Sequence, residues 1–250
     1  MSSQLRILDC RLDLVDAHEA SDRILGYARA GTSAQIVTLG TEMVVAAQRD
    51  SGFRAIINAS ALNVCDTVGL LAVARLRGAT LRERVTGVEL IELLAAQAAR
   101  EKIGVFFLGG APGVAEEAAR ALRSRYSELD VLGTADGYFA SDDEEMLMER
   151  IRSSGARLLL LGLGSPRQEV WFSRHAAALP GMVGIGVGGS FDVLSGRVAR
   201  APQGWRALHL EWLYRLLKEP SRWRRQLALL YFVWLALGEL LLGRSSRKDQ

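Results

Sequence analysis

Acidic side chains that could carry out acid–base chemistry follow apolar runs of this sequence. Asp66 comes directly after the run 62–65 and before Thr67-Val68-Gly69. At the carboxyl end of a strand, such a carboxylate could act as a general base that takes a proton from a hydroxyl group. An aspartate in this position can also cap a helix. Both interpretations stay open from the residue pattern alone.

Four further side chains could bind an anionic or sugar ligand. Arg167 and Gln168 stand in the turn after a predicted strand and could donate hydrogen bonds to phosphate or sugar oxygens, or could be exposed residues at a helix start. Asp192 ends the glycine-rich segment 186–192 and could contact a ribose or a base, or be a turn residue. Arg84 is a weaker candidate, because most lone arginines are surface residues.

Glycine-rich turns follow three of the predicted strands. The apolar run 158–161 ends in Gly162-Leu163-Gly164, the run 105–108 ends in the turn 109–113, and a third strand ends at 186–192. In a parallel sheet, such turns place helix N-termini at the carboxyl edge, where ligands bind. We therefore expect an anion-binding site there.

The elements that would position these residues alternate between strand and helix. Asp16 with Glu19 and Thr86 with Glu89 have the pattern of capping boxes. Thr41 can cap the helix that holds residues 42–48, and Pro112 suits a first helical turn. The predicted strands are 35–39, 61–65, 104–108, 129–133, 157–162 and 182–187. The predicted helices end at Gly31, Gln48, Leu76, about Lys102, Tyr126, Ser154 and Ala178. This alternation predicts an α/β fold, a mostly parallel sheet with helices on both faces.

The composition of the chain and the motifs that it lacks exclude several classes of protein. The 250 residues are 49% hydrophobic, enough for a full core, and two cysteines form no disulfide framework, so we expect a reducing cytoplasm. The N-terminal residues do not have the pattern of a secretory signal. A Walker A motif, a G-x-G-x-x-G fingerprint, zinc-spaced cysteines and histidines and a D-x-D pair are all absent from the sequence. We therefore expect no metal.

Residues 200–250 differ from the rest of the chain in charge and in hydropathy pattern. Residues 200–250 carry ten Lys and Arg against four Asp and Glu, and 211–220 indicates a helix that ends at a proline. The run 227–242 is apolar except for Gly238 and Glu239, and is shorter than the roughly 20 residues that span a bilayer. Neighbouring arginines and aromatic rings are typical of an interfacial anchor. Alternatively, the helix closes an apolar groove on its own domain or on a partner subunit. We expect a core over 1–200 and a helical, membrane-associating appendage over 201–250.

Several motifs occur in a characteristic order between about residues 35 and 232. They are Thr38 with Glu42, Asp66, 84–87, 107–113, 136–139, 162–169, 186–192, 200–202 and 211–215. In this order they resemble the WecG/TagA/CpsF family of glycosyltransferases. The resemblance implies a Rossmann-like α/β fold with a C-terminal appendage that meets the membrane.

The resemblance also implies an activity. A bacterial enzyme of this kind moves a sugar from a UDP-sugar to a polyprenyl-diphosphate-linked sugar in surface polysaccharide or teichoic-acid assembly. The sugar would be of the N-acetylmannosamine type, its uronic acid, or glucose. The reaction would invert the anomeric carbon without a metal or other cofactor. We expect a peripheral protein on the inner face of the plasma membrane, with no nucleic-acid partner.

Position by position, the resemblance implies roles for individual residues. Asp66 matches the catalytic base, and Thr38, Arg84 and Gln168 match its pocket. Asp192 matches the nucleotide side. Arginines of the appendage, expected to reach the diphosphate, are Arg215, Arg222 and Arg225. Further substrate-binding residues are expected at Gly109, Gly110, Gly137, Tyr138 and Gly164.

The sequence departs from the family pattern in its pocket. The family usually has Thr-x-Asn where this chain has Thr38-Leu39-Gly40, and relatives commonly have glycine where it has Thr67. A non-catalytic nucleotide-binding scaffold at the membrane, which would explain Gly40, therefore stays open. A nicotinamide-dependent oxidoreductase also stays open, since it would explain the glycine-rich turns, although the dinucleotide fingerprint is absent.

Overall fold

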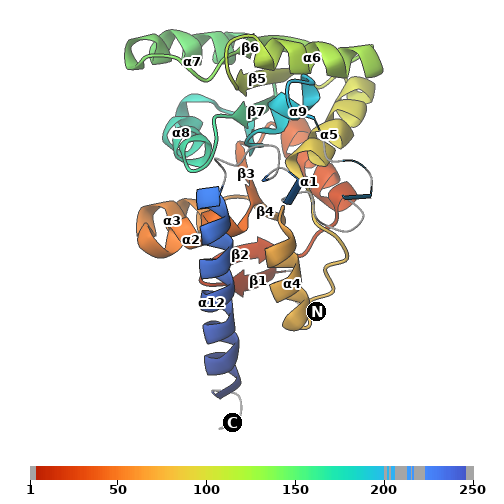
Figure 1. Ribbon diagram of the computed structural model, residues 1–250. Helices are drawn as coiled ribbons and strands as arrows, with labels where there is room; N and C mark the ends of the chain where they lie inside the picture. Colours follow the sequence, from red (N-terminus) through yellow and green to blue (C-terminus); the bar gives the residue numbers. More distant parts are fainter. Residues whose placement is uncertain are drawn as a thin grey trace.

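A six-stranded parallel sheet forms the centre of the molecule (Figure 1). The computed structural model describes residues 4–199, 202, 204, 205, 213, 214, 216 and 223–245, with the side chains of the last helix from 228 to 241. The strand order is β4-β3-β8-β7-β5-β6. The strands are β3 (Ala34–Leu39), β4 (Leu62–Cys65), β5 (Val105–Gly109), β6 (Val131–Ala135), β7 (Leu158–Gly162) and β8 (Val183–Gly186). A two-stranded antiparallel hairpin, β1 (Gln4–Ile7) and β2 (Cys10–Asp13), packs near β4.

Helices cover both faces of the sheet, which confirms the predicted Rossmann-like α/β fold. Side chains alternate along the strands, so that Phe107 and Leu160 enter one apolar core while Phe106 and Leu161 enter another on the opposite face. One face carries α1 (Ala17–Ala30), α5 (Gly87–Glu101), α6 (Val114–Arg125) and α9 (Ser190–Leu194). The other carries α2 (Thr41–Arg49), α3 (Ser51–Ala59), α4 (Val68–Leu76), η1 (Ser141–Asp143), α7 (Glu144–Ser153), α8 (Arg167–His175) and η2 (Ala176–Ala178).

The N-cap of each predicted capping box is confirmed. The Asp16 carboxylate accepts a hydrogen bond from the Glu19 amide (2.8 Å), and the Thr86 hydroxyl accepts one from the Glu89 amide (3.3 Å). The predicted end of the first helix is also confirmed, since Gly31 adopts the left-handed conformation there.

Two predicted helix starts are wrong. Thr41 is the first residue of α2 and not its cap, because Gly40 precedes the helix and the Thr67 hydroxyl accepts the Thr41 amide hydrogen bond (3.2 Å). Pro112 lies before α6 and not in its first turn. Gly113 has a φ of 84°, which is not helical, so the helix begins only at Val114.

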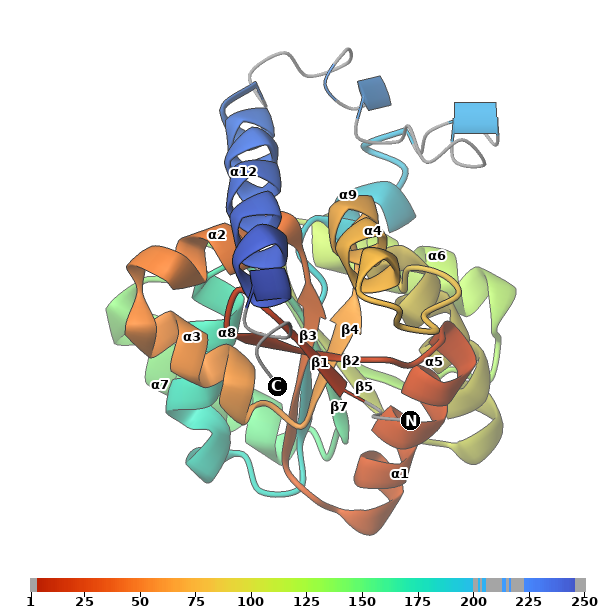
Figure 2. The same cartoon turned by 90° about the horizontal axis from the view of Figure 1, so that it is seen from below.

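A long C-terminal helix, α12 (Trp223–Ser245), lies against α2 and α4 (Figure 2). Phe232 and Ala236 are buried in the core on that face of the sheet, and the Glu239 carboxylate accepts a hydrogen bond from the Leu8 amide and pairs with Arg77. None of the helices in the described part of the chain is long and apolar enough to cross a membrane. The helix predicted over 211–219 lies mostly outside the described residues, and the division into 1–200 and 201–250 stays a prediction.

Candidate active site

A cleft of about 760 Å³ opens at the carboxyl edge of the sheet. Residues that follow all six strands line it, which agrees with the rule that ligands of such sheets bind outside the carboxyl ends of the strands. The turns that form its walls are tied to one another through their backbones. Gly110 donates to the Gly162 carbonyl (3.0 Å), and Gly137 donates to the Gly110 carbonyl (2.9 Å).

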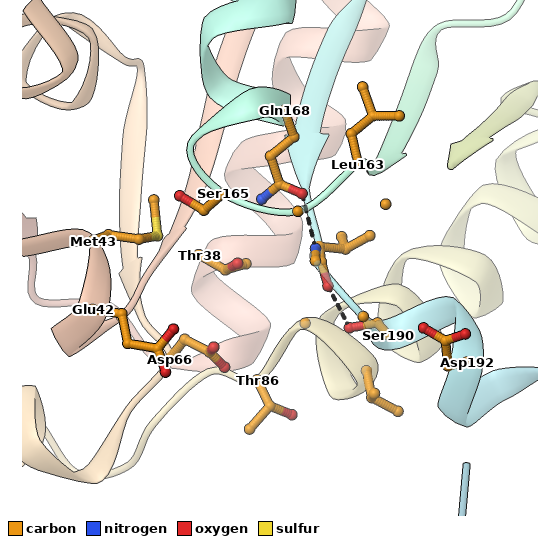
Figure 3. Close-up of a pocket in the computed structure, with 18 of the residues that line it drawn as sticks. Thr38, Glu42, Met43, Asp66, Thr86, Leu163, Ser165, Gln168, Ser190 and Asp192 are labelled. Carbon is orange, nitrogen blue, oxygen red and sulfur yellow. Dashed lines mark hydrogen bonds between the residues drawn. The ribbon is translucent and has the colours of Figure 1, made fainter. Parts of the chain in front are cut away.

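Most of the predicted site residues meet in this cleft. Its lining includes Thr38, Asp66, Arg84, Gly110, Gly137, Tyr138, Gly164, Gln168 and Asp192. Figure 3 shows Asp66 and Glu42 at one side, Asp192 at the other, and Gln168 above them. The fold therefore brings together side chains that are up to 154 positions apart in the sequence, from Thr38 to Asp192.

Four predicted residues are not placed at the cleft wall. Gly109 packs on the neighbouring strand instead, because an added Cβ would lie 2.4 Å from the Gly162 carbonyl carbon. Arg215 and Arg222 lie outside the described residues. Arg225 belongs to α12, and its side chain lies outside the description.

Asp66 occupies the position that the sequence predicted for a base. It follows β4 directly, its amide donates to the Leu39 carbonyl (3.0 Å), and its half-buried side chain lines the cleft. The preceding residue, Cys65, is buried, and burial raises the pKa of its thiol to about 12. Cys65 is therefore a neutral thiol at physiological pH, which leaves Asp66 as the acid–base group at the end of this strand.

Three helix N-termini lie at the cleft, beside the acidic side chains of Glu42, Asp66 and Asp192. The first residues of α2, α5 and α8, which are Thr41, Gly87 and Arg167, all line it. The positive end of a helix dipole favours a bound anion. One first-turn amide of α2, that of Thr41, and one of α5, that of Glu89, already donate to threonine hydroxyls, so the remaining first-turn amides are the candidate donors. The predicted anion site is therefore consistent with the geometry.

Thr38 and Gln168 are both buried and both hold the end of β8. The Thr38 hydroxyl donates to the Gly186 carbonyl (2.8 Å). The Gln168 side chain accepts a hydrogen bond from the Gly188 amide (3.0 Å) and donates to the Glu169 carboxyl group (2.6 Å). Both residues line the cleft, but these bonds show that they also fix the shape of the turn after β8.

The sequence predicted Arg167 as a possible donor to the ligand, but not its contacts within the protein. Its guanidinium donates to the Gly137 carbonyl (2.8 Å) and lies over the Phe139 ring, 5.0 Å from the ring centre. These contacts hold a cation between the turns after β6 and β7. Glu42 and Ser165 also line the cleft. An acidic residue in the first helical turn, such as Glu42, gives no distinct signal, because it favours the helix dipole wherever it occurs.

A potential metal site would need several acidic, histidine or cysteine side chains in one place. Among the residues that the structure describes, no group of three or more such side chains could hold a metal ion.

The chain matches a known family over nearly its whole length. A model of the glycosyl transferase WecG/TagA/CpsF family matches residues 5–246, a range that includes the cleft, all of the hairpin β1–β2 except its first residue, and all of α12. The family implies in general a nucleotide-sugar donor and a lipid-linked acceptor. This chain belongs to the WecG/TagA/CpsF family of glycosyltransferases.

Proposed function

We propose that this protein transfers a sugar from a UDP-sugar to a polyprenyl-diphosphate-linked sugar with inversion at the anomeric carbon. The product would enter bacterial surface polysaccharide or teichoic-acid assembly. The observation that carries the proposal is the Asp66 carboxyl group, which shares one cleft with the N-termini of α2, α5 and α8. A base and an anion-binding surface in the same cleft are the two parts that this reaction needs.

In the proposed reaction, the acceptor hydroxyl attacks the anomeric carbon of the donor. The new bond joins the acceptor oxygen to that carbon, the bond from the carbon to the phosphate oxygen breaks, and the hydroxyl proton passes to Asp66. A positioned carboxylate contributes typically about 10²–10⁴-fold to such a step. One displacement at the carbon inverts its configuration.

The leaving UDP gains negative charge as the bond breaks. In the proposal, the helix N-termini of the cleft and the guanidinium of Arg167 stabilise this charge, together with Arg84 on the segment before α5. Charge-assisted hydrogen bonds from arginine to phosphate are among the strongest in proteins. Arg215, Arg222 and Arg225 would add to this set when the lipid-linked acceptor is present.

The proposed acceptor is anchored in a membrane, and the exposed side of α12 is a surface that could bind this membrane. Its side chains Leu230, Val233, Trp234, Leu237 and Leu241 are exposed on the side opposite the buried Phe232. Apolar side chains with an aromatic ring among them can insert at headgroup depth. We propose that this stripe holds the protein on the inner face of the plasma membrane.

A panel of UDP-sugars, assayed with a polyprenyl-diphosphate-linked N-acetylglucosamine analogue, tests the proposal. We expect transfer from one of them, with UDP as the second product, and unchanged turnover in excess EDTA. Binding of UDP without transfer from any donor would instead indicate a nucleotide-binding scaffold. Thermal stabilisation by NAD, with none by UDP, would indicate an oxidoreductase.

A further inference from the structure

A buried carboxyl group lies directly behind the wall of the cleft. Glu169, on the first turn of α8, is 1% exposed. Its Oε1 atom accepts the hydrogen bond from Gln168, whereas its buried Oε2 atom has no partner with normal hydrogen-bond geometry. The Ser165 side chain nearby offsets only part of the effect of burial on the pKa of this carboxyl group. Burial raises the pKa of Glu169, which favours the neutral acid. A buried polar atom without a partner destabilises the folded state, so some other advantage is expected to maintain it.

We find this advantage in the orientation of the neighbouring side-chain amide, that of Gln168. Gln168 is 2% exposed, and its two ends face opposite partners, with Oε1 towards the Gly188 amide and Nε2 towards Glu169. Rotating the amide by half a turn would place its NH₂ group against the Gly188 N–H and its oxygen against the Glu169 oxygen. The Gly188 contact would then be lost, and so would the Glu169 contact, because Oε1 accepts from Gln168 and the proton of the neutral acid is therefore on Oε2. Gly188 and Glu169 therefore select one of two amide orientations.

The same pair of side chains packs on the last residue of β8. A Cβ at Gly186 would lie 2.6 Å from Gln168 Nε2 and 2.8 Å from Glu169 Oε1, so the two side chains fill the space that any other residue would need. On its other side, the Gly186 carbonyl accepts the hydrogen bond from Thr38. The end of β8 is thus fixed from β3 and from α8 at once.

The turn held in this way is part of the cleft. Gly188, with a φ of 53°, and Ser190 both line it, and the dashed lines of Figure 3 show the bond from Gly188 to Gln168. A shift of this turn would move the wall on the Asp192 side. In a transfer reaction, a displacement of about 1 Å at a positioning group can cost roughly 10²-fold in rate.

We propose that Glu169 is a positioning residue of this active site: it holds the Gln168 amide in one orientation and, through that amide, the turn from Gly188 to Ser190. The proposal rests on the proposed function only for its effect on turnover. The effect on the turn itself follows from the hydrogen bonds.

Two substitutions of Glu169 separate orientation from charge. Glu169→Gln keeps an oxygen that can accept from Gln168, whereas Glu169→Ala removes the acceptor. Leu147→Ala, on α7, serves as the control. Leu147 packs in the apolar cluster that also holds Trp171 and Phe172 of α8, so this substitution weakens the packing of α8 without touching Glu169. For each variant in the full chain, we would measure kcat, the Kd of UDP, and hydrogen exchange of the Gly188 amide relative to exchange through global unfolding.

With Glu169→Ala, we expect kcat to fall roughly 10- to 100-fold, a change in the Kd of UDP below about threefold, and exchange of the Gly188 amide at least about tenfold faster. Glu169→Gln should restore both kcat and protection, and Leu147→Ala should change neither. Wild-type protection of Gly188 in Glu169→Ala would overturn the proposal, as would equal loss in both Glu169 variants. If the wild-type chain transfers no sugar, the proposed function fails, while the Gly188 exchange still decides the role of Glu169.

Discussion

The cleft and the outer side of α12 are built in different ways. Backbone hydrogen bonds tie the cleft turns together, as between Gly110 and Gly162, and the sheet dictates their positions. By contrast, side chains attach α12: Phe232 is fully buried against the core, while Trp234, two positions later, is 67% exposed. The cleft is polar and enclosed by turns, whereas the outer side of α12 is an apolar stripe.

This difference teaches that the two regions can be changed separately. The cleft approaches only the inner side of α12, across Gly69 in the first turn of α4: an added Cβ there would lie 2.7 Å from Thr41, which lines the cleft, and 3.4 Å from Leu229 of α12. Away from that point, none of the described α12 side chains, 228 to 241, lines the cleft, so substitution of the exposed ones among them should alter membrane binding and leave nucleotide binding intact.

The largest effect is expected inside the cleft. Asp66→Asn should lower kcat by roughly 10²–10⁴-fold, because an amide cannot take up the hydroxyl proton, and the Kd of UDP should stay nearly unchanged. Asp192→Asn, on the opposite side, should weaken UDP binding more than it lowers kcat. Steady-state kinetics and calorimetric titration with UDP check both variants. Near-normal turnover of Asp66→Asn would remove this residue from the mechanism.

Much of the fold could be predicted because its strands are short apolar runs that end in glycine. Strand β7 was predicted at 157–162 and is observed at Leu158–Gly162. Strand β6 is shifted by two residues from its predicted position, since it is an edge strand with partly exposed side chains. The hairpin β1–β2 was not predicted, because it turns at Leu8 and Asp9, which adopt positive φ without a glycine.

The helix α3 was also missed. Asp50 breaks the helical run after α2, and its carboxylate caps the next helix by accepting a hydrogen bond from the Phe53 amide (2.9 Å). An aspartate within a polar stretch gives a weak boundary signal in a sequence.

The site was predictable where one strand end determines a residue's place, as for Asp66. It was not predictable where two distant turns meet. Arg167 and Gly137 are 30 positions apart, and Gln168 and Gly188 are 20 positions apart. Their hydrogen bonds depend on how the turns lie in space, which local sequence patterns do not encode.

The next largest effect is expected on α12. Replacing both Leu230 and Leu237 by Asn should weaken binding to vesicles that contain anionic lipid roughly 10²-fold, since each leucine that enters an apolar phase contributes about 1.5–3 kcal/mol. The Kd of UDP should not change. Flotation and titration with UDP separate the two results. The control, Glu116→Gln on an exposed part of α6, should change neither. Unchanged vesicle binding would show that the stripe serves another purpose.

A smaller effect is expected when the guanidinium group of Arg167 is removed from the cleft. Arg167→Ala should weaken UDP binding by about tenfold, because a charge-assisted hydrogen bond contributes about 1.5–3 kcal/mol and water replaces part of it. The matched control is Arg174→Ala, an exposed arginine on the same helix, which should bind UDP as the wild type does. Comparing UDP with uridine sharpens the test: if Arg167→Ala loses affinity for uridine and for UDP by the same factor, Arg167 does not contact the diphosphate.

The smallest effect is expected at Gly40, where the sequence departs from its family. Gly40 precedes α2 in an extended conformation, with a φ of −110° and no side-chain cap, and an added Cβ would make ordinary contact with Thr67 at 3.4 Å. Gly40→Asn should therefore fold, and its side chain should cap α2. Relative to Gly40→Ala, which adds a Cβ without a cap, the free energy of unfolding should rise by about 1 kcal/mol. Urea denaturation checks this difference. Because α2 both lines the cleft and carries α12, equal stability of the two variants would show that packing by α12, and not the cap, fixes the start of this helix.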